Sequence, residues 1–166
     1  MIKQHFDIEK GFATQEDLLT IFNYLSGDNA HYDKSGEIRY LGYNEFLDKD
    51  VVAKLESYSR RAYSYIQDQY GYTLDAFNPN KVHIEIIESG SGFMNSYDMS
   101  RSGEIGIFML INKTPEVNSL SFNGIKPKEF SNGDMVFFTE GEGFVKNMDP
   151  SSSELYTMVQ WFQPIV

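Results

Sequence analysis

Few side chains in this sequence are suited to metal or acid–base chemistry. There are three histidines, His5, His31 and His83, and no cysteine, so thiolate metal sites and disulfides are excluded. No histidine stands at a tight metal-binding spacing from another histidine or a carboxylate, such as i, i+4 on a helix. His5 and His31 fall in predicted loops, and we expect both on the surface.

One pair of ligand-type side chains does share a predicted strand face. Residues 81–86 alternate between polar and aliphatic side chains, which puts His83 and Glu85 on one face of a β-strand. A solvated strand face is the simpler interpretation. A metal-ligand role for His83 is the alternative.

Two glycine-flanked segments contain residue types that occur in active sites. Ser89-Gly90-Ser91-Gly92 lacks the strand-to-helix context of a hydrolase elbow and the Lys-Ser/Thr ending of a phosphate loop. Glu140 and Glu142 flank a glycine and could serve acid–base chemistry or bind a hard cation. Ordinary turns explain both segments adequately.

The order of several motifs is more specific than any single one. Residues 87–98 read Ile-Glu-Ser-Gly-Ser-Gly-Phe-Met-Asn-Ser-Tyr-Asp. This segment resembles the Tyr-x-x-Gly, spacer, His-x-Asp motif of prolyl-4-hydroxylase-like oxygenases, which depend on 2-oxoglutarate and iron(II). Aligning Gly90 with the family glycine places Ile87 at the tyrosine, Ser96 at the first metal histidine and Asp98 at the metal aspartate, without a gap.

Later landmarks of the same family follow in order. They are the strand ending in Asn112, the Leu-x-Phe of residues 118–122, Lys126-Pro127, the Gly-x-hydrophobic-Phe run of 132–138, and a last strand, 156–162, with its Trp-Phe ending. The resemblance covers about residues 14–162, and its specific part is 84–162.

The metal positions implied by the resemblance are mostly replaced. The family holds iron with two histidines and one carboxylate. Here Ser96 stands at the first histidine position, and the second falls on Val145 or Lys146, depending on the landmark used. Asp98 is the one retained ligand type.

The 2-oxoglutarate position is also changed. The basic residue that grips the distal carboxylate of this dianion is replaced by Leu155, or by Glu154 with a one-residue shift, so the expected salt bridge is lost. Arg101 and Lys113 could substitute only if the fold brings them close.

The resemblance, with these losses, implies a degenerate oxygenase-like protein without iron or catalysis, acting as a binding or structural module, with a virus or phage as the expected source. One alternative is an active prolyl-4-hydroxylase-like dioxygenase using iron(II) and 2-oxoglutarate, with a site rebuilt from Asp98, His83 and Glu140 or Glu142. Another is a cupin-like binder of a small polar molecule. In a third interpretation no ligand binds, and an ion pair between Asp98 and Lys146 fills the vacated metal site.

Charge and hydropathy restrict the partners and the location. A net charge of −10 argues against nucleic acid, because phosphate binding needs clustered Lys and Arg. No apolar stretch approaches the roughly 18 residues of a membrane helix, and the first residues lack the apolar core of a signal peptide. We therefore expect a cytoplasmic protein, with a protein partner or a homo-oligomer left open.

Two helices followed by many strands must position these residues. Helical spacing predicts a helix over 15–26, with a capping box at Thr14 and Asp17, and a second over 47–70 ending at Gly71. In the first, Leu18, Phe22 and Leu25 form the apolar face. In the second, the apolar face comprises Val51, Leu55, Tyr58, Ala62 and Ile66.

Strand-like alternation begins at residue 81. The strands predicted after 81–86 are 104–111, 119–122, 134–138, 143–148 and 155–162, and residues 38–41 form a short earlier one. The pattern favours a sandwich or open barrel backed by helices, and the resemblance specifies a double-stranded β-helix. The expected class is α+β, mainly β: a jelly roll backed by N-terminal helices, in one domain over 1–166, with helical support over 14–71 and the core over 81–162.

Overall fold

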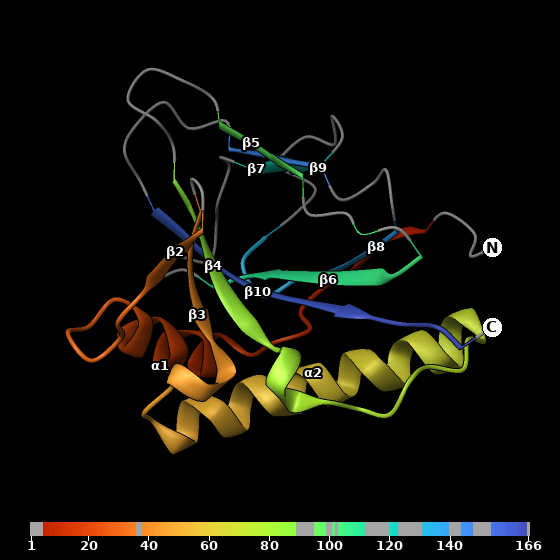
Figure 1. Ribbon diagram of the computed structural model, residues 1–166, viewed down its shortest axis with the longest axis horizontal. Helices are drawn as coiled ribbons and strands as arrows, with labels where there is room; N and C mark the ends of the chain where they lie inside the picture. Colours follow the sequence, from red (N-terminus) through yellow and green to blue (C-terminus); the bar gives the residue numbers. More distant parts are fainter. Residues whose placement is uncertain are drawn as a thin grey trace.

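The structure is a computed structural model that describes residues 5–35, 38–88, 95–98, 101, 103–111, 120–122, 131–139, 144–147 and 154–165. Three layers are visible in this part of the chain: two α-helices, a seven-stranded sheet and a three-stranded sheet (Figure 1). The helices and the small sheet lie on opposite sides of the large sheet. For the three strands of the small sheet the structure describes the backbone alone.

The strand order of the large sheet is β1-β8-β6-β10-β4-β3-β2, and every neighbouring pair is antiparallel. The small sheet has the order β5-β9-β7. Neighbours in space are mostly not neighbours in sequence, as expected when strands alternate between two facing sheets. The strand bounds are β1 Phe6–Glu9, β2 Asp33–Ser35, β3 Ile38–Gly42, β4 His83–Glu88, β5 Asn95–Asp98, β6 Ile105–Leu110, β7 Leu120–Phe122, β8 Met135–Phe138, β9 Phe144–Asn147 and β10 Glu154–Phe162.

Both predicted helices form, and Thr14 and Gly71 cap them as predicted. Of the expected capping box only the Thr14 side-chain bond forms, because the Thr14 N–H and the Asp17 carboxylate both bond the Tyr58 hydroxyl. Helix α1 spans Gln15–Leu25, and the Thr14 hydroxyl accepts a hydrogen bond from the backbone N–H of Asp17. Helix α2 spans Lys49–Tyr70 and ends at Gly71, whose φ of 71° is the left-handed conformation that glycine adopts without strain. Two short 3-10 helices, η1 (Tyr43–Glu45) and η2 (Pro79–Lys81), precede α2 and β4.

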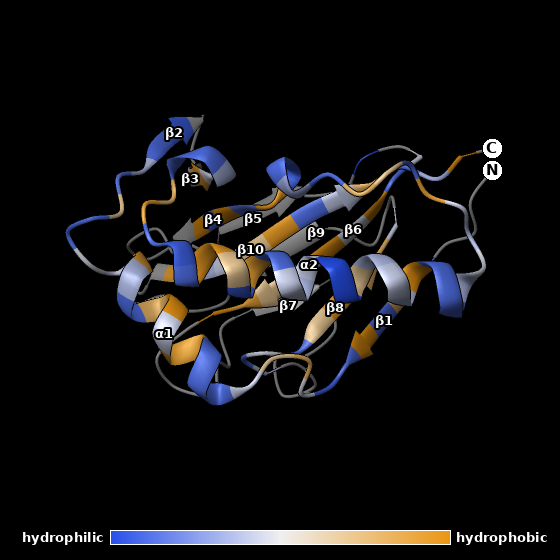
Figure 2. Cartoon of the chain, turned by 90° about the horizontal axis from the view of Figure 1, so that it is seen from below, coloured by the Kyte–Doolittle hydropathy of each residue, from blue (hydrophilic) through white to orange (hydrophobic). Residues whose placement is uncertain are grey.

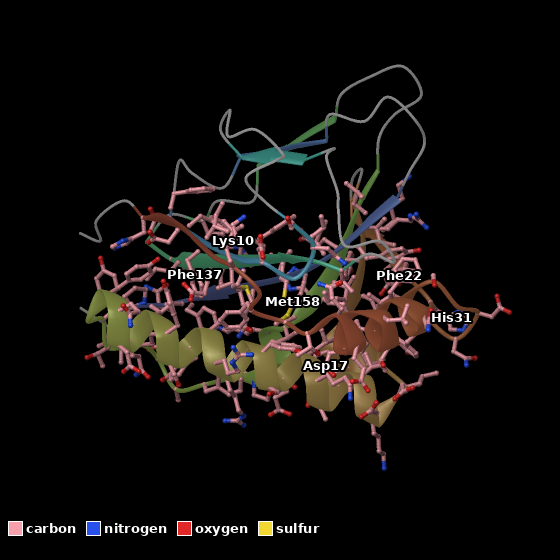
Figure 3. The ribbon with its side chains drawn as sticks, turned by 180° about the vertical axis from the view of Figure 1, so that it is seen from behind. Lys10, Asp17, Phe22, His31, Phe137 and Met158 are labelled. Carbon is pink, nitrogen blue, oxygen red and sulfur yellow. The ribbon has the colours of Figure 1, made fainter. Side chains whose placement is uncertain are left out.

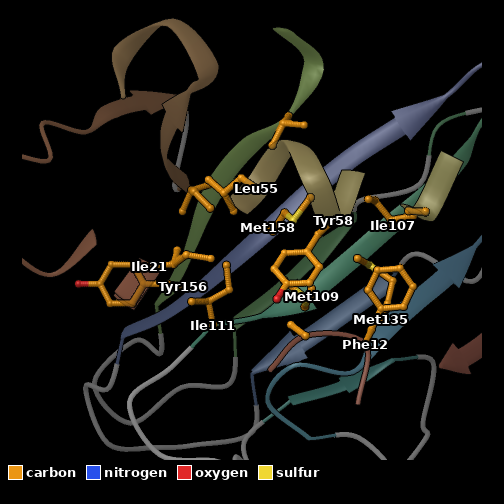
Figure 4. Close-up of a cluster of buried hydrophobic side chains, with 14 of the residues drawn as sticks. Phe12, Ile21, Leu55, Tyr58, Ile107, Met109, Ile111, Met135, Tyr156 and Met158 are labelled. Atoms are coloured by element: carbon orange, nitrogen blue, oxygen red, sulfur yellow. The ribbon is translucent and has the colours of Figure 1, made fainter. Parts of the chain in front are cut away.

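The helices cover one face of the large sheet (Figure 2), and each of them has a set of buried apolar residues. All five residues predicted for the apolar face of α2 are buried. In Figure 4, Leu55 and Tyr58 of this helix meet Met109 and Met158 of the sheet. Burying a Leu or Ile side chain contributes about 1.5–3 kcal/mol, so this contact layer is a main source of stability. In α1 the residue that is buried together with Leu18 and Leu25 is Ile21, and the predicted Phe22 is partly exposed.

The opposite face of the large sheet carries a second apolar cluster. We call this face, which points away from the helices, the inner face. Its buried cluster consists of Phe108, Leu110, Val136, Phe138, Leu155, Val159 and Trp161. Gly106 of β6 lies within this cluster and is paired with Phe138 on the neighbouring strand β8. A Cβ at Gly106 would stand 2.3 Å from Cζ of Phe138, so only glycine lets the ring cover the strand at this point.

The N-terminal region contributes strands that the sequence did not predict. Strand β1 forms one edge of the large sheet through pairing with β8, and β2 forms the other edge through pairing with β3. The support region expected over residues 14–71 is therefore not purely helical. Strand β5 was also not predicted, because its four residues, Asn-Ser-Tyr-Asp, show no alternation of apolar and polar side chains.

Candidate functional site

The inferred metal positions lie on neighbouring strands of the small sheet. In the β5–β9 register, Ser96 is opposite Lys146, Tyr97 is opposite Val145, and Asp98 is opposite Phe144. Opposite residues and residues two apart belong to the same sheet face. Position 146, rather than 145, therefore shares a face with positions 96 and 98. The side chains at these positions lie outside the described part of the structure, as do Lys113, Glu140 and Glu142.

Leu155, the residue at the inferred 2-oxoglutarate position, begins the inner-face row of β10. Its side chain is 3% exposed and belongs to the apolar cluster of the inner face. It lies opposite Ile87 of β4 in the sheet register. No member of this cluster carries a charge. The environment of Leu155 is therefore suited to a hydrocarbon side chain.

A polar strip runs beside this cluster on the same face of the sheet. Glu85 of β4 is opposite Thr157 of β10, and Tyr40 of β3 is opposite Glu85 on its other side. The Thr157 hydroxyl donates a hydrogen bond of 2.7 Å to the backbone carbonyl of Glu85. The side chain of Glu85 is 15% exposed, and its Oε2 atom is buried without a hydrogen-bond partner among the described residues.

His83 stands next to Glu85 and is held on both sides of its ring. Its Nε2 atom lies 3.2 Å from Oε1 of Glu85, and its Nδ1 atom lies 3.2 Å from the backbone carbonyl of Lys81. The imidazole stacks against Trp161 with a centroid separation of 5.5 Å and an interplanar angle of 25°. The predicted alternation of β4 is confirmed, but the face of His83 and Glu85 is largely buried rather than solvated.

Arg101 is engaged at the opposite end of β10 from Leu155. Its guanidinium carbon lies 3.8 Å from the centre of the Trp161 ring, a favourable cation–π geometry. Six residues separate Leu155 from Trp161 along one strand, which corresponds to roughly 20 Å. Arg101 therefore does not lie beside Leu155, where the resemblance implies a basic residue.

Two of the three histidines were predicted to be surface residues, and the structure supports this for one of them. His31 is exposed and points away from the molecule (Figure 3). His5 is instead half-buried. Its ring stacks on Tyr70 at 4.0 Å, and its Nε2 atom lies 3.2 Å from the hydroxyl of Tyr72. The prediction failed because β1 and α2 meet only in the folded chain.

No sequence pattern indicated directly that Trp161 and Arg101 would lie together. Trp161 entered only as a landmark of the last strand, although it lies in the same alternating set as Leu155, Thr157 and Val159. The alternation of β10 could have placed Trp161 on the inner face, the same face as His83. In the described ranges no group of three or more His, Asp or Glu side chains could hold a metal ion.

No helix in the part of the chain that the structure covers is both long and apolar enough to cross a bilayer. No protein-family model matches the sequence, and no curated protein matches it.

Solved structures do match the fold. A prolyl-4-hydroxylase from Pseudomonas putida superposes with a TM-score of 0.66 at 11% identity, over 99% of this chain and 95% of its own. A viral collagen prolyl hydroxylase from Paramecium Bursaria Chlorella virus-1, in complex with 2-oxoglutarate, gives 0.59 at 14% identity, over 97% and 96%. HygX from Streptomyces hygroscopicus, with nickel and 2-oxoglutarate bound, gives 0.61 at 10% identity, over 97% and 83%.

These structures share the arrangement of strands and helices over almost the whole chain, at identities that establish the fold alone. The predicted jelly roll backed by N-terminal helices is confirmed. This chain has the double-stranded β-helix fold of the prolyl-4-hydroxylases and of other 2-oxoglutarate/iron(II)-dependent oxygenases.

Proposed function

We propose that this protein is a non-catalytic jelly-roll module that uses the oxygenase fold for binding or assembly, without iron or 2-oxoglutarate. The observation that carries the proposal is the environment of Leu155. The side chain is 3% exposed within an apolar cluster, where a bound 2-oxoglutarate would need a buried cation for its distal carboxylate.

The residues at the metal positions also fit iron poorly. A serine hydroxyl at position 96 is a weaker ligand than imidazole, and the register places a lysine opposite it, at position 146. A protonated amine repels a divalent cation. The change from a metal centre to a Ser, Asp and Lys set is consistent with an ion pair between Asp98 and Lys146 in place of the metal.

Anaerobic titration of the purified protein with ferrous iron, in the presence and absence of 2-oxoglutarate, tests this proposal. We expect no saturable heat, no stoichiometric iron by metal analysis and no succinate production. Saturable 1:1 iron binding would overturn it. So would succinate formation that needs 2-oxoglutarate and disappears in Asp98→Ala but not in Asp28→Ala, a control at an exposed turn residue.

A second candidate function is a working oxygenase of the prolyl-4-hydroxylase type with rebuilt ligands. The observation in its favour is that His83 and Glu85 lie on the inner face, where Oε2 of Glu85 is buried and has no hydrogen-bond partner in the described part of the chain. This candidate predicts that iron-dependent succinate production is lost in His83→Ala and retained in His31→Ala. Activity that survives His83→Ala would exclude this ligand set.

The first proposal also includes where the protein is located, where it comes from and what it binds. We infer a cytoplasmic protein of viral or phage origin, supported by a similar fold in a viral collagen prolyl hydroxylase. A non-catalytic module would act through a protein partner or a second copy of itself. Light scattering after size-exclusion chromatography measures the molar mass: a mass of about 19 kDa would exclude the self-assembled form.

A further inference from the structure

A hollow lies where the start of β4 meets the end of β10, remote from Leu155. It has a volume of ≈ 260 Å³ and is lined by Asn80, Lys81, His83, Arg101, Glu104 and Trp161. Drug-sized ligands occupy clefts of about 300–1,000 Å³, so this space suits a smaller molecule. Nothing in the proposed function assigns a role to it.

The cations at its rim differ from others in the chain. Lys10, Lys54 and Arg60 each lie 3.0 Å from a carboxylate oxygen. In the described part of the chain, neither Lys81 nor Arg101 has a carboxylate within ion-pair distance. Two uncompensated cations beside one hollow are notable in a chain of net charge −10, because they attract an anionic group there.

The rim also presents one carboxylate, Glu104, for which the described residues supply no counter-charge. Arg101 and Glu104 stand at the two ends of one turn, closed by a 3.1 Å bond from the Glu104 N–H to the Arg101 carbonyl. Their side chains both line the hollow, yet they form no ion pair with each other. Each charge is therefore open to a ligand group of opposite sign.

The floor of the hollow is rigid. Trp161 is 7% exposed and sits in β10 between β6 and β4. Its ring stacks against the imidazole of His83. The two ring nitrogens of His83 lie within hydrogen-bond distance of the Glu85 carboxylate and the Lys81 carbonyl. Arg101 is fixed over the indole at 3.8 Å. A preorganised rim loses little conformational entropy when a ligand binds.

We propose that this hollow binds a small zwitterion of the α-amino-acid type. The ligand carboxylate lies between Lys81 and Arg101, its ammonium group lies at Glu104, and its short side chain lies against the accessible edge of Trp161. Both signs of charge at the rim are then compensated. Charge-assisted hydrogen bonds of this kind are stronger than neutral ones.

Titration of the full chain with three probes tests this inference, using calorimetry and the fluorescence of Trp161, the single tryptophan. The probes are L-alanine, propionate, which lacks the ammonium group, and ethylamine, which lacks the carboxylate. We expect saturable binding of L-alanine, and binding of the other two that is weaker by about tenfold or more, since tenfold corresponds to about 1.4 kcal/mol. Propionate that binds as tightly as L-alanine, or no saturable signal from L-alanine by either method, would overturn the inference.

Four variants assign the binding to this hollow. Arg101→Gln and Glu104→Gln should each weaken L-alanine binding about tenfold. Lys49→Gln and Asp28→Asn make the same charge changes at exposed positions away from the hollow and should leave binding unchanged. Losses in Lys49→Gln and Asp28→Asn as large as those in Arg101→Gln and Glu104→Gln would mean that L-alanine does not bind at this hollow, and would overturn the inference. The iron titration is a separate measurement, so failure here leaves the proposed function standing, and the reverse also holds.

Discussion

At the scale of single residues, the chemistry of this fold depends on a few positions whose side chains are replaceable. Leu155, which the resemblance aligns with the cation of the 2-oxoglutarate position, is packed among aromatic and aliphatic residues. His83 retains a ligand-type ring, but both of its nitrogens already face acceptors. The backbone pairing is regular in both sheets, so the chemistry that these positions allow depends on residue identity rather than on the fold.

Restoring a cation at position 155 should destabilise the protein. In Leu155→Lys an ammonium group would replace a side chain that is 3% exposed in an uncharged cluster. An uncompensated buried charge costs on the order of 3–5 kcal/mol. Chemical denaturation measures the free energy of unfolding, and Leu47→Lys, at a residue that is 70% exposed, should change it by no more than about 0.5 kcal/mol. If Leu155→Lys lowered the free energy of unfolding by less than about 1 kcal/mol, a counter-charge or water would have to lie beside position 155. That result would contradict the non-catalytic proposal, which rests on an apolar environment there.

At the scale of elements, the helices are fixed to the sheet by polar as well as apolar contacts. Ser59 is a buried polar residue on the apolar face of α2, and its hydroxyl donates a hydrogen bond to the side-chain carbonyl of Gln160 in β10. Both residues are at most 1% exposed. Buried polar pairs of this kind specify how one element docks on another, because each partner loses its hydrogen bond if the helix shifts.

Removing one member of this pair should cost more than removing both. In Ser59→Ala the Gln160 oxygen loses its donor inside the core, and we expect a loss of about 1–3 kcal/mol in the free energy of unfolding. Ser57→Ala on the exposed face of the same helix is the matched control and should stay within about 0.5 kcal/mol. Adding Gln160→Leu to Ser59→Ala should recover part of the loss. If all three variants were equally stable, the bond would have no net role in docking.

At the scale of the whole molecule, two tyrosines of α2 are hydrogen-bonded to carboxylates far away in the sequence. The Tyr70 hydroxyl in the last turn of α2 donates a hydrogen bond to Asp7 of β1. The Tyr58 hydroxyl in its first half donates one to Asp17 of α1. Burial, followed by these carboxylate contacts, raises the pKa of both tyrosines above the ordinary value of 10.0. The folded protein therefore holds both phenolic protons more tightly than the unfolded chain does.

This difference predicts an alkaline loss of stability. Below about pH 10 both states keep these protons, and the tyrosines add no pH dependence. Above it the unfolded chain releases them while the folded protein retains them, so the free energy of unfolding falls as pH rises. Urea denaturation between pH 8 and 11 measures the slope, which Tyr70→Phe should make shallower. An unchanged slope in this variant would contradict the assignment to Tyr70.

The sequence by itself determined the features that depend on near neighbours. Helix caps at Thr14 and Gly71 and the alternation of β4 were predicted from a few adjacent residues, because capping and periodicity act within one or two turns. The order of the family motifs added the jelly roll. The same alignment predicts that Ser96 and Leu155 stand at a metal position and at the 2-oxoglutarate position, since motif spacing is a property of the chain.

Only the tertiary structure decided which distant residues meet. Strand β1 pairs with β8 more than 120 residues away, and this brings His5 onto Tyr70. Likewise the β5–β9 register set Lys146, and not Val145, opposite Ser96. Arg101 reached Trp161 rather than Leu155. Such pairings are selected by the packing of the whole core, to which each strand contributes only part of the stabilising contacts. Short sequence patterns therefore contain too little information to specify them.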